Sequence, residues 1–237
     1  MNLPGKRCLD VGAGAGSITH FLADQVGENG AVTALDINPI HIQPHPRLTI
    51  IEHDLTTDTI EGHYDLIHAR LVLGHLPDRG PILYRLIQAL APGGYLLIED
   101  WYIPDHTIDD MVITAPSPHA KALYLKLQHA MSTGVFTAAG TDRTWARRVN
   151  PLLRAAGLHD VTTTIASSLW QGGRDSGTRL IATSILELHD QLLAAGLAED
   201  ELSTGQQLLD NPELLLAGHL LYSTSGQRDA STVEHQA

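Results

Sequence analysis

The feature that most constrains the fold of this chain is the segment Cys8–Ser17, which reads CLDVGAGAGS. Residues 7–11 form a short apolar run bounded by turn residues, a pattern that indicates a buried strand. Three alternate glycines follow, and then apolar residues at helical spacing, namely Ile18, Phe21, Leu22 and Val26. Gly27 stands where a helix commonly ends. A strand, a glycine turn and a helix together direct backbone N–H groups and the positive helix end toward a ligand.

The spacing of the glycines narrows the class of ligand. A dinucleotide-binding turn has the pattern G-x-G-x-x-G, which requires glycine at position 17, whereas this chain has Gly16 followed by Ser17. Asp10, two residues before the first glycine, is not part of the dinucleotide pattern either. Taken alone, the segment is also compatible with a tight turn that binds nothing.

Length, charge and cysteine content limit the classes of protein. A chain of 237 residues fits one large domain, or one domain with helical insertions. The net charge of −12 disfavours a surface that follows phosphates, so we expect no nucleic-acid partner. The only cysteine, Cys8, permits no disulfide within the chain and suits a cytoplasmic location. The sequence contains no run of 18 apolar residues, so we expect no membrane partner.

The histidines do not indicate a metal site. Fourteen histidines are scattered along the chain. His41 and His45 would share one face only on a helix, and Pro44 and Pro46 exclude a helix there. We therefore expect no bound metal.

Two further aspartates follow the next predicted strands. Residues 31–35 form an apolar strand that ends at Asp36, and residues 48–52 form a third strand followed by Asp54. Because an ionised carboxylate only accepts hydrogen bonds, Asp36 is suited to hold both hydroxyls of a ribose. Dinucleotide enzymes use the same arrangement. The structural alternatives are a helix N-cap for Asp36 and a loop cap for Asp54.

The fourth and fifth predicted strands also end in polar residues. Residues 64–68 form the fourth strand, residues 81–90 a helix, and residues 95–99 the fifth strand, which is followed by Asp100. In open α/β sheets, ligands bind beyond the carboxyl ends of the strands. We therefore expect residues 68–70 to face the ligand site.

In this order, these segments resemble those of class I S-adenosylmethionine-dependent methyltransferases. The resemblance covers about residues 7–101. Within it, the chain is similar to actinobacterial small-molecule methyltransferases that share the opening RCLDVGAG-x-GSI and the segment HARLVL. It implies S-adenosyl-L-methionine as the cofactor, with Asp54 accepting a hydrogen bond from the adenine amino group. The cofactor-binding residues that it implies are Asp10, Gly12, Ala13, Gly14, Gly16, Ser17, Asp36, Ile37, Asp54, Leu55, His68 and Arg70.

The fold implied by the resemblance is an α/β, Rossmann-like fold. We expect a seven-stranded, mostly parallel, doubly wound sheet with an antiparallel last strand and two helical insertions. Residues 1–226 form a single methyltransferase domain in this interpretation, and residues 227–237 a disordered tail. The insertions, residues 101–141 and 172–211, form a lid over the carboxyl edge of the sheet.

The remaining elements are predicted from the apolar pattern. Residues 144–156 form a helix, 161–169 the sixth strand, 178–195 and 198–209 the helices of the second insertion, and 214–223 the last strand. Only Met1–Lys6 precede the first strand, whereas methyltransferases of this type carry one or two covering helices there. We interpret this as a truncated chain, a misassigned start, or a site covered by the later insertions.

The resemblance implies methyl transfer to a small metabolite or a peptide by in-line displacement on the sulfonium methyl. We expect His68, Asp100 and His106 to contact the acceptor, although each taken singly has a structural alternative. No Asn/Asp-Pro-Pro-Tyr/Phe motif is present, which disfavours methylation of base amino groups. The alternatives are a non-catalytic S-adenosylmethionine-binding protein, a truncated inactive methyltransferase or, more weakly, an NAD(P)-dependent oxidoreductase. Association into a homodimer is left open.

Overall fold

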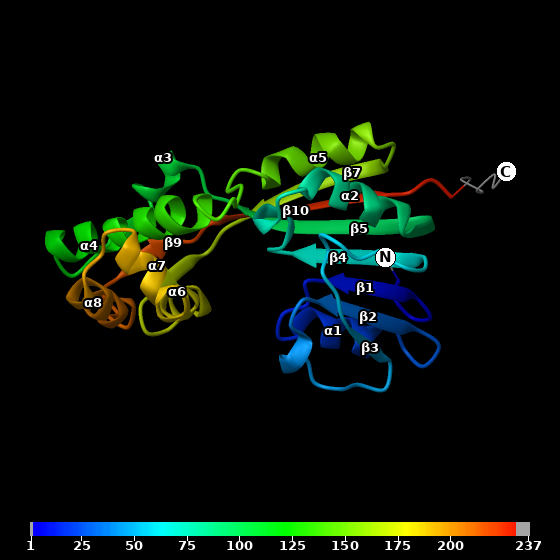
Figure 1. The fold of residues 1–237 in the computed structure, drawn as a ribbon, viewed down its shortest axis with the longest axis horizontal. Coiled ribbons are helices and arrows are strands. Elements are labelled where there is room, and N and C mark those ends of the chain that lie inside the picture. The colour runs from blue at the N-terminus through cyan, green and yellow to red at the C-terminus, as the bar shows by residue number, and fades with distance from the viewer. Residues whose placement is uncertain (1, 231–237) are drawn as a thin grey trace. The chain divides into compact units, whose positions relative to one another are not determined.

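The computed structural model describes residues 2–230, and these form two compact units. The first unit consists of residues 2–100, 145–164 and 222–230, and the second of residues 101–144 and 165–221. Both are drawn in Figure 1. Among the described residues, no helix is long and apolar enough to cross a membrane.

The first unit is built on a seven-stranded sheet with the order β3-β2-β1-β4-β5-β10-β7. The four pairs formed by β3, β2, β1, β4 and β5 are parallel. The predicted mostly parallel sheet with an antiparallel strand is confirmed. The strands are β1 (Arg7–Val11), β2 (Ala31–Asp36), β3 (Leu48–Glu52), β4 (Tyr64–Arg70), β5 (Leu90–Tyr102), β7 (His159–Ala166) and β10 (Leu220–Gln227).

Helices cover the two faces of this sheet unequally. On one face, α2 (Arg79–Gln88) and α5 (Ala146–Ala155) bury their apolar residues in the main core, together with Ile67 and Ile98 of the sheet. On the other face, α1 (Ser17–Gln25) contacts β1, β2 and β3 and packs around the buried Cys8. Figure 1 shows α1 beside these three strands, in blue, and α2 and α5 beside β5 and β7, in green.

The unequal cover of the two faces is visible in the burial of the side chains of β5. Leu96 and Ile98 are buried, whereas Tyr95 and Leu97 are half-buried. Because successive side chains of a strand point to opposite faces, Tyr95 and Leu97 lie on the face that α2 and α5 do not cover. Phe21 of α1, which the apolar pattern placed with the buried residues, is 55% exposed.

The second unit has its own core and a small sheet. The three-stranded sheet has the order β6-β9-β8, and β9 pairs antiparallel with both neighbours. Its core includes Tyr124, Leu127 and Ile185. The elements are β6 (Val112–Thr114), β8 (Leu169–Gln171), β9 (Leu215–Ala217), α3 (Asp105–Ile108), α4 (Pro118–His129), the π-helix η3 (Ala130–Thr137), α6 (Ser176–Glu187), α7 (His189–Ala194) and α8 (Glu199–Leu209).

Several predicted elements are divided in the structure. The predicted last strand, 214–223, is two strands, of which β9 joins the small sheet and β10 the large one. The break falls at Gly218, where an added Cβ would lie 2.6 Å from the ring of Trp170. The predicted strand 161–169 likewise becomes β7 and β8, and the predicted helix 178–195 becomes α6 and α7.

The predicted boundaries also need correction. Both predicted insertions fall in the second unit, which additionally contains residues 142–144, 165–171 and 212–221. The prediction that the tail begins at residue 227 places its start too early, because Gln227 is the last residue of β10. Residues 231–237 lie outside the described residues.

Candidate functional site

The turn between β1 and α1 requires glycine at three positions. Gly12, Gly14 and Gly16 have φ angles of 63°, 57° and 83°, a region that other residues rarely adopt. A Cβ added to Gly12 would lie 2.3 Å from Cγ2 of Val72, so close packing also demands glycine there. A Cβ added to Gly14 would meet no heavy atom within 4 Å. The turn therefore borders open space at Gly14.

Asp36 joins the end of β2 to this turn. Its Oδ2 accepts a hydrogen bond from the Gly14 N–H at 2.7 Å, and its Oδ1 accepts one from the Asn38 N–H at 2.8 Å. Each carboxylate oxygen has two lone pairs, so each can still accept a bond from a hydroxyl. Asn38, and not Asp36, is the N-cap of the short helix η1 (Pro39–His41). Next to Asp36, Ile37 leaves its apolar side chain 68% exposed.

Asp54 closes the turn after β3. Its Oδ1 accepts hydrogen bonds from the Thr56 N–H at 2.8 Å and from the Thr56 hydroxyl at 2.7 Å. Because both bonds stabilise the ionised form, they lower the pKa of Asp54. This is the loop cap that the sequence left as an alternative, and the contact of Asp54 with adenine stays a prediction. The side chain of Leu55 lies in the main core and not at the turn surface.

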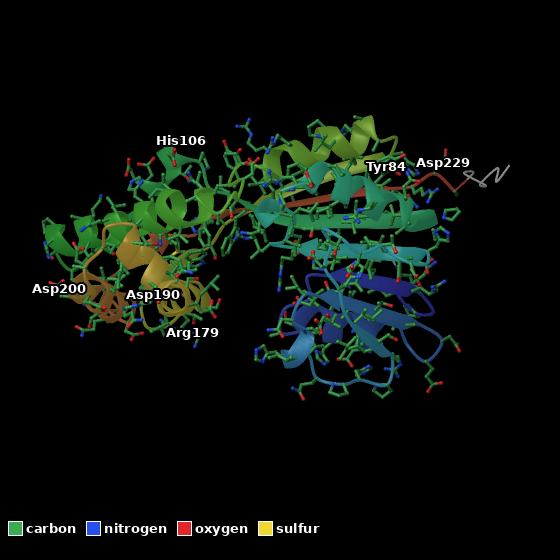
Figure 2. All side chains as sticks on the ribbon, viewed as in Figure 1. Tyr84, His106, Arg179, Asp190, Asp200 and Asp229 are labelled. Carbon is green, nitrogen blue, oxygen red and sulfur yellow. The ribbon has the colours of Figure 1, made fainter. Side chains whose placement is uncertain are left out.

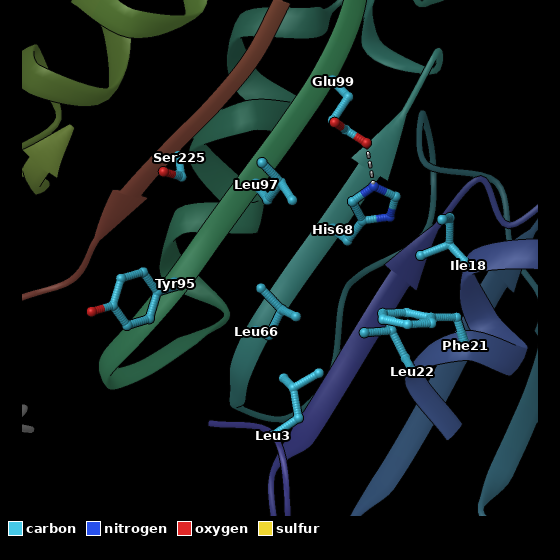
Figure 3. A pocket seen from close by; sticks show the side chains of 10 residues that line it. All are labelled: Leu3, Ile18, Phe21, Leu22, Leu66, His68, Tyr95, Leu97, Glu99 and Ser225. Carbon is cyan, nitrogen blue, oxygen red and sulfur yellow. Dashed lines mark hydrogen bonds and ion pairs between the residues drawn. The ribbon is translucent and has the colours of Figure 1, made fainter. Parts of the chain in front are cut away.

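A buried histidine connects three neighbouring strands of the first unit. His68 of β4 places Nδ1 2.8 Å from Asp10 Oδ1 on β1 and Nε2 3.3 Å from Glu99 Oε2 on β5. Figure 3 shows the second of these contacts. The second oxygen of each carboxylate also accepts a hydrogen bond. The Thr19 hydroxyl donates to Asp10 Oδ2 and the Ser223 hydroxyl donates to Glu99 Oε1, both at 2.5 Å.

The surroundings of His68 favour its charged form. Burial alone would lower its pKa, but hydrogen bonds and charge interactions with Asp10 and Glu99 outweigh burial and raise the pKa. In the same way, the bond from His68 lowers the pKa of Glu99 against the opposing effect of burial. Because both ring nitrogens of His68 face carboxylate oxygens, neither nitrogen is turned toward a substrate.

Asp100 lies on the opposite face of β5 from Glu99. It is buried, and its Oδ2 has no hydrogen-bond partner among the described residues. Burial raises its pKa to about 7, against the smaller opposing effects of a bond from the Gly74 N–H and the charge of Arg79. The prediction of a shared acceptor site required Asp100 and His68 to lie on the same side of the sheet. The structure places their side chains on opposite faces.

Of the remaining predicted residues, Ser17, Arg70 and His106 are exposed and Ala13 is half-buried. Arg70, at the end of β4, donates to the Ser17 hydroxyl at 3.2 Å, so both side chains lie beside the glycine turn. His106 is exposed on α3 of the second unit, as Figure 2 shows, and is not part of the cluster around His68. Within residues 2–230, no group of three or more histidine, cysteine or acidic side chains is arranged to hold a metal.

A family model for a methyltransferase domain matches residues 2–198, which is more than half of the chain. The chain belongs to this methyltransferase family. The resemblance to class I S-adenosylmethionine-dependent methyltransferases is thereby confirmed.

The methyltransferase shares part of its length with characterised relatives. It is 38% identical over 98 residues to methyltransferase str2 of Strobilurus tenacellus, covering 40% of this chain and 35% of the relative. It is 29% identical over 168 residues to a trans-aconitate 2-methyltransferase of Methylobacterium radiotolerans, covering 69% of this chain and 58% of the relative. The match thus spans about a third to somewhat over half of each relative.

Solved structures with low sequence identity share the fold. The YcgJ protein of Bacillus subtilis superposes with a TM-score of 0.57 at 13% identity, covering 94% of this chain and 92% of that one. A phosphoethanolamine N-methyltransferase 2 of Haemonchus contortus, solved with phosphomonomethylethanolamine and S-adenosylhomocysteine, gives 0.54 at 14% identity, covering 95% and 49%.

Sequence analysis missed three members of the His68 cluster. Glu99 was noted only as the end of a strand, and neither Thr19 nor Ser223 was singled out. Thr19 offers a local signal, since it lies on the first turn of α1 above Asp10. Ser223 offers none, because 124 residues separate it from Glu99.

Proposed function

We propose that this methyltransferase domain binds S-adenosyl-L-methionine and transfers its methyl group to a small molecule. The observation that carries the proposal is the pairing of open space at Gly14 with the carboxylate of Asp36, whose oxygens retain lone pairs. A ribose offers two adjacent hydroxyl donors, which match the two oxygens. The exposed side chain of Ile37 supplies an apolar surface for a base beside them.

When bound, the sulfonium supplies an activated methyl group, which passes to the acceptor by in-line displacement and leaves S-adenosylhomocysteine. The residues of the chain then act mainly by holding the cofactor and the acceptor in position. Alignment of two reactants can supply about 7–11 kcal/mol of the barrier. Asp36 orients the nucleoside, and the Asp10–His68 pair fixes the end of β1 from which the glycine turn departs.

His68 is in this proposal a positioning residue and not a base. Both of its ring nitrogens face carboxylates, at 2.8 Å and 3.3 Å, and the charged form donates to both. The neighbouring carboxylate of Glu99 is the better candidate to accept a hydrogen bond from an acceptor hydroxyl or amine. Asp100 and His106 remain predictions as residues that contact the acceptor.

The names of the relatives favour a small-molecule acceptor over a peptide. Trans-aconitate stands in the name of the Methylobacterium radiotolerans relative, and phosphoethanolamine in the name of a further relative, phosphoethanolamine N-methyltransferase 1 of Zea mays. A cytoplasmic location and the absence of a nucleic-acid partner are part of the same proposal, supported by the lone Cys8 and the net charge of −12.

Calorimetry with S-adenosylhomocysteine and NAD tests the proposal. We expect S-adenosylhomocysteine to bind more tightly than NAD, and the reverse order would contradict the proposal and favour the oxidoreductase. Asp36→Ala removes charge-assisted bonds and should cost about 1–3 kcal/mol of binding free energy. Glu61→Ala, which removes an exposed carboxylate before β4, is the matched control and should bind as the wild type does.

A further inference from the structure

The segment that follows β4 packs against the glycine turn. We call this segment, residues 71–76, the β4 turn. Val11, the last residue of β1, pairs with Ala69 of β4, so the two strands leave the sheet next to each other. Val72 then lies against Gly12, where an added Cβ would be 2.3 Å from Cγ2 of Val72. The position of Val72 therefore limits the space that Gly12 can occupy.

The backbone of the β4 turn is strained at its first residue. Leu71 has a φ angle of 58°, a conformation that a residue with a side chain rarely adopts. Its N–H donates to the Glu99 carbonyl oxygen at 2.8 Å, which ties Leu71 to β5. A strained backbone persists only where neighbouring contacts enforce it, and such conformations gather at functional sites. Further contacts must hold the rest of the turn, because this bond fixes only its first residue.

A buried carboxylate holds the centre of the β4 turn. The Gly74 N–H, within the short helix η2 (Leu73–His75), donates to Asp100 of β5. Asp100 is 4% exposed, and its Oδ2 has no hydrogen-bond partner among the described residues. Buried polar atoms in proteins usually have a partner, and exceptions occur chiefly at functional sites. The burial of a carboxylate at this position therefore indicates a role other than stability.

The bond at Gly74 is connected to Val72 through the backbone of η2. The His75 N–H donates to the Val72 carbonyl oxygen at 3.0 Å, so Val72 belongs to the hydrogen-bonded turn of η2. Arg79 donates from Nε and Nη2 to two carbonyl oxygens of η2, at 3.3 Å and 3.4 Å. Arg79 thus holds carbonyl groups of η2, and Asp100 holds an N–H group.

We propose that Asp100 is a positioning residue of the cofactor site, which holds Val72 against Gly12 through η2 and so sets the shape of the glycine turn. The assignment to a cofactor site rests on the proposed function, whereas the coupling of Asp100 to Gly12 does not. In this role Asp100 serves as a hydrogen-bond acceptor. Asparagine keeps an acceptor oxygen and can replace it, whereas alanine cannot.

NMR spectra of the protein without ligand test the coupling. Asp100→Ala should shift the amide resonance of Gly12, and Asp100→Asn should shift it much less. Asp65→Ala is the matched control, because Asp65 also accepts a backbone N–H, that of Arg7 at 2.9 Å, near the start of β4. Asp65→Ala should leave the Gly12 resonance in place. An unshifted Gly12 resonance in Asp100→Ala, or equal shifts in Asp100→Ala and Asp100→Asn, would overturn the proposal.

Calorimetry with S-adenosylhomocysteine tests the consequence for the cofactor. Asp100→Ala and Val72→Ala should each weaken binding at least about fivefold. Asp100→Asn and Asp65→Ala should bind within about twofold of the wild type. Because Asp100 and Val72 act through one contact, the double variant should bind little more weakly than either single variant. Independent, additive losses in the double variant would show that Asp100 acts by another route and would overturn the proposal.

Two further outcomes separate this role from the alternatives. If folded Asp100→Ala has a lower free energy of unfolding but binds S-adenosylhomocysteine as the wild type does, Asp100 does not position the cofactor site and the proposal is overturned. If the wild type does not bind S-adenosylhomocysteine while Asp100→Ala still shifts the Gly12 resonance, the proposed function is overturned. Asp100 would then stand as a positioning residue of the glycine turn for another ligand.

Discussion

At the scale of single residues, Gly12 and Gly14 differ in what an added methyl group would meet. Both have positive φ, so alanine at either position pays about 1–2 kcal/mol for the left-handed conformation. Only at Gly12 does the added Cβ also collide with Val72, at 2.3 Å. We expect Gly12→Ala to lower the free energy of unfolding by about 3 kcal/mol or more, and Gly14→Ala by about 1–2 kcal/mol. Urea denaturation measures both.

The same pair of variants separates stability from binding. The methyl group of Gly14→Ala would occupy open space that we assign to the cofactor, so it should weaken binding of S-adenosylhomocysteine while the domain stays folded. If Gly14→Ala bound S-adenosylhomocysteine as the wild type does, the cofactor would not lie against this turn.

Asp100 gives a stability effect that depends on pH. Its pKa is raised from 3.8 to about 7 by burial, so the folded state holds this proton more tightly than the unfolded state does. The contribution of Asp100 is therefore unaffected below about pH 4 and becomes progressively unfavourable as pH rises to about 7. Asp100→Asn should be close to neutral at pH 4 and stabilise by on the order of 2 kcal/mol at pH 8.

At the scale of elements, the His68 cluster ties β1, β4 and β5 together. Because the pKa of His68 is raised, its stabilising contribution is complete below about pH 6.5 and is lost as pH rises through the folded-state value. His68→Gln leaves two carboxylates without their shared cation and should destabilise by about 3 kcal/mol at pH 6. The difference from the wild type should shrink as pH rises through the folded-state pKa of His68. A difference that is constant with pH would show that His68 acts through packing alone.

The elements that the sequence predicted well are those with a local signal. The glycine turn, α1 and the strands that end at Asp36 and before Asp54 follow from apolar periodicity and turn residues within a few positions. The small sheet was missed because β6 and β9 have three residues each and are stabilised by partners about a hundred residues away. The exposure of Phe21 was missed for a related reason, since amphipathic spacing shows which face is apolar but not whether another element covers it.

At the scale of the whole molecule, the main core of the first unit shares no residue with the core of the second unit. Ile67 lies in the first core and Ile185 in the second, and both are 0% exposed. Each isoleucine-to-alanine substitution should cost about 2–5 kcal/mol of stability in its own unit. Only Ile67→Ala is expected to weaken binding of S-adenosylhomocysteine, because the glycine turn and Asp36 belong to the first unit. Calorimetry showing an equal loss in Ile185→Ala would contradict this division.

The single cysteine gives the molecule a built-in reporter. Burial in β1, with a smaller effect from the charge of Asp65, raises the pKa of Cys8 to about 12, so almost no thiolate exists near neutral pH in the folded chain. A thiol-alkylating reagent can then modify this chain only when β1 opens. The rate of alkylation therefore reports the opening of the first unit. Because the sequence contains no second cysteine that would have to be replaced, the alkylation rate of Cys8 can be measured on the unaltered protein.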